Sequence, residues 1–408
     1  MKIPVFPLLL LATMLHMNLP GTVIYVNHAA TGACDGSSWI DAFTCLQPAI
    51  DAAVEGDEIW VAEGTYYPTS DHGLNLGTGG RHFRMKTGVG IYGGFNGQET
   101  ERDERDWSVQ ATVLSGDLGL PDDKNDNAWH VFFHPDDYNV DYTAILDGFT
   151  ITMGMAAYHM DNECGGGMYL RAGSPGITNC LFTKNEAREG GGVYAIHSQA
   201  VFTNCRFSEN DAGDGGGIYL LESQVEITNS VFEKHSGGGW GGGLYVKDSS
   251  LNLLHCSIIN NSTMSSGPGI EISGSEGVIT HSIFRKNSSA YSGGAVCSSN
   301  SSLKISDTVI MENRGASNAG MGFYSSTGSI LNCLITNNSS EGIGSASGLM
   351  SGNIGGLDLS RSSPEILNCV ITGNSAAKSV GGIKMYESSP KIVNCIINGN
   401  IASEGAGG

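Results

Sequence analysis

Four tyrosines stand at one position of a repeating pattern and could bind a ligand through their rings. They are Tyr169, Tyr194, Tyr219 and Tyr245. At an outward position on successive strands, such rings would form an aromatic strip on which sugar rings or a partner protein stack. The alternative is structural, because tyrosines in adjacent strands also stack on one another without a ligand. The sequence makes these tyrosines ligand-binding candidates and leaves both interpretations open.

A second group of candidate ligands lies in an oxygen-rich loop. Asp117, Asp122, Asp123 and Asp126 occur among Gly, Pro and Asn residues, a composition that suits weak Ca²⁺ binding. Their spacing fits no EF-hand loop, and a solvated surface loop accounts for the same residues. We therefore predict no metal site and no cofactor, with weak Ca²⁺ binding by this loop as the alternative.

Cysteines provide a third candidate chemistry, because thiols form disulfides, bind metals or fill a core. Six of the ten cysteines recur at one repeat position, which Ser or Thr occupies in the other copies: Cys180, Cys205, Cys256, Cys333, Cys369 and Cys395. Parallel side chains stacked about 4.8 Å apart exceed the Cβ separation of roughly 4.5 Å that a disulfide allows. Buried free thiols are therefore predicted. Cys34 and Cys45 lie outside this column and are a candidate disulfide, whose formation the sequence leaves open.

These residues are positioned by a repeat of about 25 residues that begins with a glycine-rich block. The blocks start at Gly165, Gly190, Gly215, Gly241, Gly267, Gly293, Gly320, Gly355, Gly381 and Gly407. The residue assigned after each block is apolar: Met168, Val193, Ile218, Leu244, Ile270, Ala295, Phe323, Leu357 and Ile383. Two residues later the side chains are again apolar or small, with Cys297 and Ser325 in the sixth and seventh copies. This alternation predicts a short strand with one buried face.

Each copy also contains two polar columns. The first is Asn179, Asn204, Asn229, His255, His281, Asp307, Asn332, Asn368 and Asn394, and the second is Asn185, Asn210, His235, Asn261, Asn287, Asn313, Asn338, Asn374 and Asn400. Asn tolerates a left-handed backbone at sharp turns, and its amide bonds neighbouring backbone groups. When copies stack at the strand spacing, these amides are expected to form a ladder from copy to copy.

The repeat predicts an all-β fold, a single-stranded right-handed parallel β-helix in which each copy is one coil. Residues 165–408 give nine coils, and each coil needs to pair only with its neighbours. Leucine-rich and helical repeats are excluded, because the chain shows neither their Leu spacing nor a 3.6-residue period. A new coil should begin where the sequence stops at Gly408, so we expect a further C-terminal segment.

The first 164 residues predict a leader, a cap and less regular coils. Residues 1–21 have one basic residue followed by an apolar run, which is typical of a secretory signal peptide. Residues 22–55 are predicted to be an N-terminal cap, whose short helix over 46–54 covers the open end of the solenoid. Residues 56–164 are predicted to be irregular first coils with long polar loops.

Charge and hydropathy exclude several partners. The net charge is −20, from 41 acidic and 21 basic residues, which argues against nucleic acid and anionic lipid. After residue 21 no segment approaches 18 consecutive apolar residues, so no membrane-spanning helix is predicted. The signal peptide indicates a secreted or cell-surface protein.

The glycine blocks, paired with Phe-x-x-Asn motifs such as Phe182 to Asn185, resemble the paired motifs of bacterial polymorphic outer-membrane proteins. The head, from Gly36-Ser-Ser-Trp39 to Gly64-Thr-Tyr66, is similar to right-handed parallel β-helix repeat proteins of the pectin-lyase-like superfamily. The resemblance implies a secreted protein or one associated with the bacterial outer membrane, with a role in adhesion. Glycans and surface proteins are the partners that it implies.

The same superfamily contains polysaccharide lyases and hydrolases, so the resemblance also raises the question of catalysis. Polygalacturonase-like members need an aspartate cluster, a His and an Arg-x-Lys element, but the only Arg-x-Lys is Arg84-Met-Lys86, in the head. Pectate-lyase-like members need a Ca²⁺-binding acid cluster with an Arg base, whereas the acidic residues of 165–408 are scattered. We predict no catalytic residues and a non-enzymatic scaffold for adhesion or interaction. The alternative is a carbohydrate-active β-helix, which would be a polysaccharide lyase, a glycoside hydrolase or a glycan-binding module.

Overall fold

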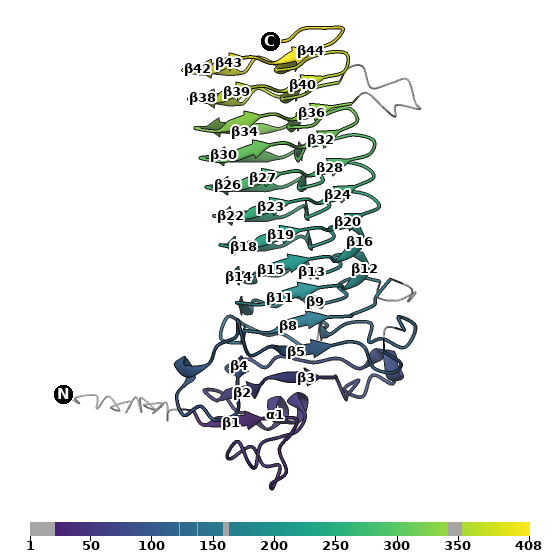
Figure 1. The fold of residues 1–408 in the computed structure, drawn as a ribbon, viewed down its shortest axis with the longest axis vertical. Helices are drawn as coiled ribbons and strands as arrows, with labels where there is room; N and C mark the ends of the chain where they lie inside the picture. The colour runs from purple at the N-terminus through teal and green to yellow at the C-terminus, as the bar shows by residue number, and fades with distance from the viewer. Residues whose placement is uncertain (1–20, 122, 137, 158–162, 342–352) are drawn as a thin grey trace, which may run out of the picture.

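The chain winds into a column of stacked coils that runs from its N-terminal to its C-terminal end (Figure 1). The computed structural model describes residues 21–121, 123–136, 138–157, 163–341 and 353–408. The predicted signal peptide therefore lies outside the described residues, except for Gly21. Over the described residues, strands of successive coils pair in parallel and form four sheets of thirteen, twelve, ten and nine strands, here named A, B, C and D. The predicted all-β parallel β-helix is confirmed.

Each regular coil passes through sheets C, A, B and D in that order. Sheet A consists of β1 (Val23–Val26), β2 (Glu58–Ala62), β4 (Gly90–Phe95), β7 (Ile145–Asp147), β10 (Gly176–Thr178), β14 (Val201–Thr203), β18 (Gln224–Thr228), β22 (Ser250–Leu254), β26 (Glu276–Thr280), β30 (Ser302–Ser306), β34 (Thr327–Leu331), β38 (Glu365–Leu367) and β42 (Lys391–Val393). Sheet B consists of β3 (Gly64–Tyr66), β5 (Thr112–Ser115), β8 (Thr150–Thr152), β11 (Leu181–Thr183), β15 (Arg206–Ser208), β19 (Val231–Glu233), β23 (Ser257–Ile259), β27 (Ile283–Arg285), β31 (Val309–Met311), β35 (Leu334–Thr336), β39 (Val370–Thr372) and β43 (Ile396–Asn398).

Sheets C and D form the rest of the wall. Sheet C consists of β6 (Phe132–His134), β9 (Met168–Arg171), β13 (Val193–Ile196), β17 (Ile218–Leu221), β21 (Leu244–Lys247), β25 (Ile270–Ser273), β29 (Val296–Ser299), β33 (Met321–Tyr324), β37 (Leu357–Ser360) and β41 (Ile383–Tyr386). Sheet D consists of β12 (Glu186–Glu189), β16 (Asp211–Asp214), β20 (Ser236–Gly237), β24 (Ser262–Thr263), β28 (Ser288–Ser289), β32 (Arg314–Gly315), β36 (Ser339–Ser340), β40 (Ser375–Ala376) and β44 (Ile401–Ala402).

One short helix, α1 (Leu46–Ala52), lies at the N-terminal end of the described part of the column (Figure 1). Leu46, Ala49 and Ile50 are fully buried and join the hydrophobic core. The helix ends two residues before the predicted Val54, whose side chain is exposed. Its apolar face covers core residues that no preceding coil would otherwise shield. Two 3-10 turns, Thr78–Gly80 and Arg102–Glu104, lie in the loops of the head.

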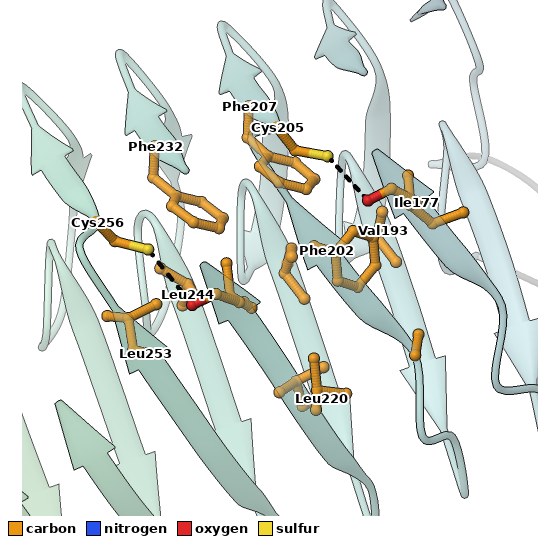
Figure 2. Packing of buried hydrophobic residues seen from close by; sticks show 14 of the residues in the cluster. Ile177, Val193, Phe202, Cys205, Phe207, Leu220, Phe232, Leu244, Leu253 and Cys256 are labelled. Carbon is orange, nitrogen blue, oxygen red and sulfur yellow. Dashed lines mark hydrogen bonds between the residues drawn. The ribbon is translucent and has the colours of Figure 1, made fainter. Parts of the chain in front are cut away.

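The core consists of inward-facing apolar columns that run along the axis of the solenoid. In sheet B, the rings of Phe182, Phe207 and Phe232 stack with centroids 5.0 and 4.6 Å apart (Figure 2 shows Phe207 and Phe232). Parallel pairing in register places each ring over its counterpart, as in the pair Phe182 and Phe207. Burial of these rings, and of the isoleucines that take the same place in other coils, contributes favourably to the folding free energy.

The two polar columns have different structural roles at the corners: one allows a left-handed turn, and the other forms hydrogen bonds between coils. The column that begins at Asn179 has a left-handed backbone throughout, with φ from 50° to 56°. The column that begins at Asn185 is buried, except for the half-buried Asn400, and forms the predicted ladder. For example, the side-chain amide of Asn287 donates to Oδ1 of Asn313 at 3.1 Å, and Oδ1 of Asn287 accepts from the amide of Asn261 at 3.0 Å. The ladder and the left-handed turns are thus both confirmed.

The Cys column is explained by hydrogen bonding rather than by disulfides. The backbone N–H of Cys205 donates to Ser230 Oγ at 3.0 Å, and that of Cys333 donates to Cys369 Sγ at 3.5 Å. Cys, Ser and Thr interchange because each places a small acceptor at this corner. All ten cysteines are free thiols, including Cys34 and Cys45, so the candidate disulfide is not formed.

A similar column of serines was not predicted. The backbone N–H of Ser223 donates to Ser249 Oγ, and that of Ser249 donates to Ser275 Oγ, both at 3.0 Å. These serines lie at the corner between sheets C and A, directly after a left-handed residue such as Asp248. The backbone donors at this corner are therefore satisfied from coil to coil, as they are at the cysteine corner.

The predicted register is wrong in two coils. Val296, not Ala295, pairs with Ile270 as the first inward residue of sheet C, and Met321, not Phe323, pairs with Val296. In each case a residue other than glycine occupies part of the glycine block, so counting from the glycines misplaces the strand. Phe323, rather than Ser325, is then the second inward residue of its strand.

Candidate ligand-binding site

The four candidate tyrosines lie on the outer side of sheet C but are not exposed. Tyr169, Tyr194, Tyr219 and Tyr245 are only 7, 6, 3 and 8% exposed, and with Phe133 they form a small second hydrophobic cluster. Neighbouring rings stack with centroids 5.5 and 5.3 Å apart, and the last pair meets edge to face at 4.9 Å. Of the two interpretations left open by the sequence, the rings therefore follow the structural one: they stack on one another and do not form an exposed strip.

The connections from sheet D to sheet C cover this outer side. In one connection the ring of Trp240 lies 6.1 Å from that of Tyr245, and in the next Ser266 Oγ donates to Glu271 at 2.7 Å. Burial beneath these connections raises the pKa of Tyr245 to about 12. The tyrosine rings thus pack under the loops, which leaves no open ring face for a flat ligand.

The same buried layer becomes polar toward the C-terminal end. Glu271 and Cys297 follow Tyr245 in register, and both are buried. Burial raises the pKa of Glu271 to about 7, although hydroxyl groups of Ser266 and Ser299 donate to its carboxylate at 2.7 and 3.2 Å. Glu271 cannot contact a ligand in solution, because the loop above it closes the site.

Two aromatic residues and a methionine lie exposed on these connections. Trp240, Met264 and Tyr291 are 47, 48 and 53% exposed. The N–H of Ser265 donates to Gly239 O, and the N–H of Tyr291 donates to Met264 O, so successive connections lie against one another and Trp240 and Tyr291 stand two coils apart. Two strand spacings separate these positions by roughly 10 Å. We call these three residues the loop patch.

The backbone under the loop patch is firmly held. The N–H of Trp240 donates to Asp214 Oδ1 at 2.7 Å, and Ser317 Oγ donates to the carbonyl of Tyr291 at 3.2 Å. Among the described residues from 165 to 382, Trp240 and Tyr291 are the tryptophan and tyrosine with large exposure. Sequence reasoning missed them because they lie outside the repeating columns; large side chains in connections rich in Gly, Ser and Ala were the available signal.

Two grooves lie at the corner between sheets B and D, outside the asparagine ladder. The first has a volume of about 490 Å³ and is lined by Lys286, Ser288, Glu312, Asn313, Arg314, Asn337 and Ser339. The second has a volume of about 360 Å³ and is lined by Lys124, Met153, Lys184, Asn185, Glu186, Glu209 and Asp211. Strand β28 carries Ser288 at the first groove and leads three residues later to Tyr291 of the loop patch.

The outer side of sheet D connects these features. Its outward residues in successive coils are mostly serines: Ser236, Ser262, Ser288, Arg314, Ser339 and Ser375. A row of hydroxyl groups therefore runs along the axis, with the grooves on one side and the loop patch on the other. We call this surface, with the grooves and the loop patch, the sheet D face.

Three of the four carboxylates that line the grooves are held in ion pairs, and the fourth, Asp211, accepts a hydrogen bond from Ser236 Oγ. Glu186 pairs with Lys124 at 2.6 Å, Glu209 with Lys234 at 3.5 Å, and Glu312 with Arg285 at 2.9 Å. The hydrogen bond from Arg285 lowers the pKa of Glu312. A general acid needs the opposite change, a pKa raised toward the working pH. This arrangement suits recognition of polar groups better than proton transfer.

The head contains two other predicted candidates. In the acidic loop, Asp126 accepts from the N–H of Leu120 at 2.7 Å and Asp123 from the N–H of Asn125 at 3.1 Å, while Asp122 lies outside the described residues. Within the described part of the chain, no group of three or more His, Cys, Asp or Glu side chains could hold a metal ion.

The Arg-x-Lys element lies in the head and contacts the cap helix. Arg84 Nε contacts His82 Nε2 at 3.1 Å, and the guanidinium lies 5.0 Å from the centre of the Tyr138 ring. Lys86 Nζ donates to backbone carbonyls of Asp51 and Ala53, at the C-terminal end of α1. These contacts hold the helix against the head, so the motif has a structural explanation.

The sequence matches one family model, described as the right handed beta helix region, over residues 157–240 and 216–354. No curated protein matches the chain. Similar solved structures include pectate lyase Pel9A, with 14% identity over 93% of this chain and 79% of that chain and a TM-score of 0.42. PfbA, a surface adhesin of Streptococcus pneumoniae, has 15% identity over 88% of this chain and 87% of that chain, with a TM-score of 0.45. An endo-xylogalacturonan hydrolase from Aspergillus tubingensis has 14% identity over 95% of this chain and 100% of that chain, with a TM-score of 0.34.

The family match and the fold define the class of protein. The chain folds as a right-handed parallel β-helix with one short helix in the described residues, and residues 157–354 match the model of the right handed beta helix region. None of the described helices is long and apolar enough to span a lipid bilayer.

Proposed function

We propose that this protein is an exported, non-enzymatic β-helix scaffold, secreted or held at the bacterial cell surface, that binds an extended partner along the sheet D face. The observation that carries the proposal is the loop patch. Trp240, Met264 and Tyr291 expose large side chains on a solenoid that buries its other large aromatic rings in the same coils. Exposed Trp and Tyr residues of this kind are enriched among those that dominate binding energies.

The sheet D face is suited to an extended partner because of its shape and chemistry. The two exposed rings offer apolar faces about two coils apart, and the serine row offers donors and acceptors along the same axis. The parallel pairing of β20, β24 and β28 holds all of these groups on a rigid support, which lowers the entropic cost of binding. A glycan chain or an extended segment of a surface protein would lie along the column and contact several coils.

A glycan array and a panel of surface-protein extracts would test this function. The wild-type protein should bind one class of partner, and Trp240→Ala or Tyr291→Ala should weaken that binding at least tenfold. Tyr142→Ala, which removes an exposed ring in the head, serves as the matched control and should bind normally. Equal binding by all three variants would contradict a role for the sheet D face.

A second measurement separates binding from catalysis. The protein is incubated with each polysaccharide that it binds, and new reducing ends and unsaturated products are quantified. The proposal expects binding without products. Product release by the wild-type protein would instead establish the carbohydrate-active alternative, in which case the loop patch would act as a substrate subsite.

A further inference from the structure

Two histidines form an exposed pair at the corner between sheets A and B. His255 and His281 are successive members of the left-handed column, with φ of 54° and 50°. Both side chains are exposed, and their ring centroids lie 4.8 Å apart with the ring planes at 41°. The preceding residues, Leu254 and Thr280, pair in register, so the two imidazoles leave the backbone side by side.

The hydroxyl group of Thr280 links His281 to Ser306 and can fix the tautomer of His281. Thr280 Oγ1 lies 3.0 Å from His281 Nδ1 and 3.0 Å from Ser306 Oγ. The threonine hydroxyl has one proton; when it donates to Ser306, it accepts from Nδ1–H and leaves the lone pair of His281 on Nε2. Histidines that bind metals are commonly oriented in this way by a hydrogen bond to the other ring nitrogen.

The charge around the pair also favours a cation. Asp307 is the next member of the same column, one coil farther along, and its carboxylate accepts from the amide of Asn332 at 3.1 Å. The carboxylate adds negative charge next to the two imidazole rings, on a chain whose net charge is −20.

We propose that His255 and His281 together bind a divalent late-transition-metal ion, with water completing its coordination. Two imidazole nitrogens about 2.0–2.1 Å from a shared ion stand roughly 3 Å apart, a separation that rotation of adjacent rings can reach from the observed stacking. Imidazole selects Cu²⁺, Ni²⁺ and Zn²⁺ over Mg²⁺ and Ca²⁺, and Cu²⁺ should bind most tightly. The pair supplies two protein ligands, in keeping with the finding that no larger group of metal-binding side chains occurs in the described chain.

Isothermal titration calorimetry of the tag-free full-length protein with Zn²⁺ tests this proposal. His255→Gln and His281→Gln should each weaken Zn²⁺ binding at least tenfold, since each leaves a single imidazole. His197→Gln is the matched control, because His197 is also exposed and left-handed but pairs with Glu222 at 3.4 Å. Wild-type affinity in either pair variant, or no binding of Zn²⁺ by the wild-type protein at millimolar concentration, would overturn the site.

Electron paramagnetic resonance with one equivalent of Cu²⁺ provides a second readout. The wild-type spectrum should show coupling to two imidazole nitrogens, and each pair variant should show coupling to one fewer. Circular dichroism checks that the variants keep the strand content of the wild-type protein. Identical Cu²⁺ spectra from wild-type protein and folded pair variants would refute the proposal whatever the calorimetry showed.

Discussion

Glu271→Gln should stabilise the protein above neutral pH and leave its stability nearly unchanged in acid. Burial raises the pKa of Glu271 to about 7 in the folded chain from an ordinary value of 4.5. Well below pH 4.5 the carboxyl is protonated in both the folded and the unfolded chain, so it does not change the free energy of unfolding. As the pH rises toward 7, only the unfolded chain ionises, and the folded state progressively loses relative stability.

The difference between the two pKa values of Glu271 gives the stability that the folded chain loses on ionisation. At roughly 1.4 kcal/mol per pKa unit, the ionised carboxylate costs the folded state about 3 kcal/mol above pH 7. Gln keeps the size of the side chain and can bond the hydroxyl groups of Ser266 and Ser299, but it has no charge to desolvate. For a chain of 408 residues that unfolds as a unit, 3 kcal/mol corresponds to an increase in Tm of about 3 °C.

The assay compares urea and thermal unfolding of the wild-type protein and the variant from pH 4 to pH 8.5. The difference between them should be close to zero at pH 4 and should grow through pH 5–7 to a plateau. Glu276→Gln is the matched control, because Glu276 lies on an exposed position of β26, and its difference should stay flat. A difference for Glu271→Gln that does not change with pH would refute the assignment of a buried, easily protonated carboxyl.

Three further substitutions test the interior of the column. Asn287→Ala removes the oxygen that accepts from both the N–H and the side-chain amide of Asn261, so urea unfolding should show a loss of about 2–4 kcal/mol. The exposed Asn252→Ala should change stability by less than about 0.5 kcal/mol, and a similar loss in both variants would speak against the ladder. Phe207→Ala should cost about 3–5 kcal/mol, and calorimetry that finds less than about 1 kcal/mol would contradict its place in the ring stack. Cys256→Ser should stay within about 1 kcal/mol of wild type, because Ser already occupies this corner in both neighbouring coils; a larger loss would show that the thiol itself is required.

The sequence by itself determined the parts of the protein that repeat. The strand spacing brings each residue next to its counterpart one coil away, so a column such as Asn261 and Asn287 predicts its own contacts. The ladder, the left-handed corners and the free thiols of the Cys column followed from this one rule. The short cap helix was also predictable, because an apolar helix face before the first core strand has little else to cover.

Only the tertiary structure shows the contacts within a coil, between the connections and the outer side of the sheets. The repeat places Tyr219 on the outside of sheet C, but the connection from sheet D folds back over that surface and buries the ring. The same connections bury Glu271 and expose Trp240 and Tyr291. The path of these connections depends on packing between segments that do not repeat and on the space left by neighbouring side chains. The repeat positions of the sequence give no information about either. The loops therefore determine which side chains this solenoid exposes, whereas the repeat of about 25 residues determines its core.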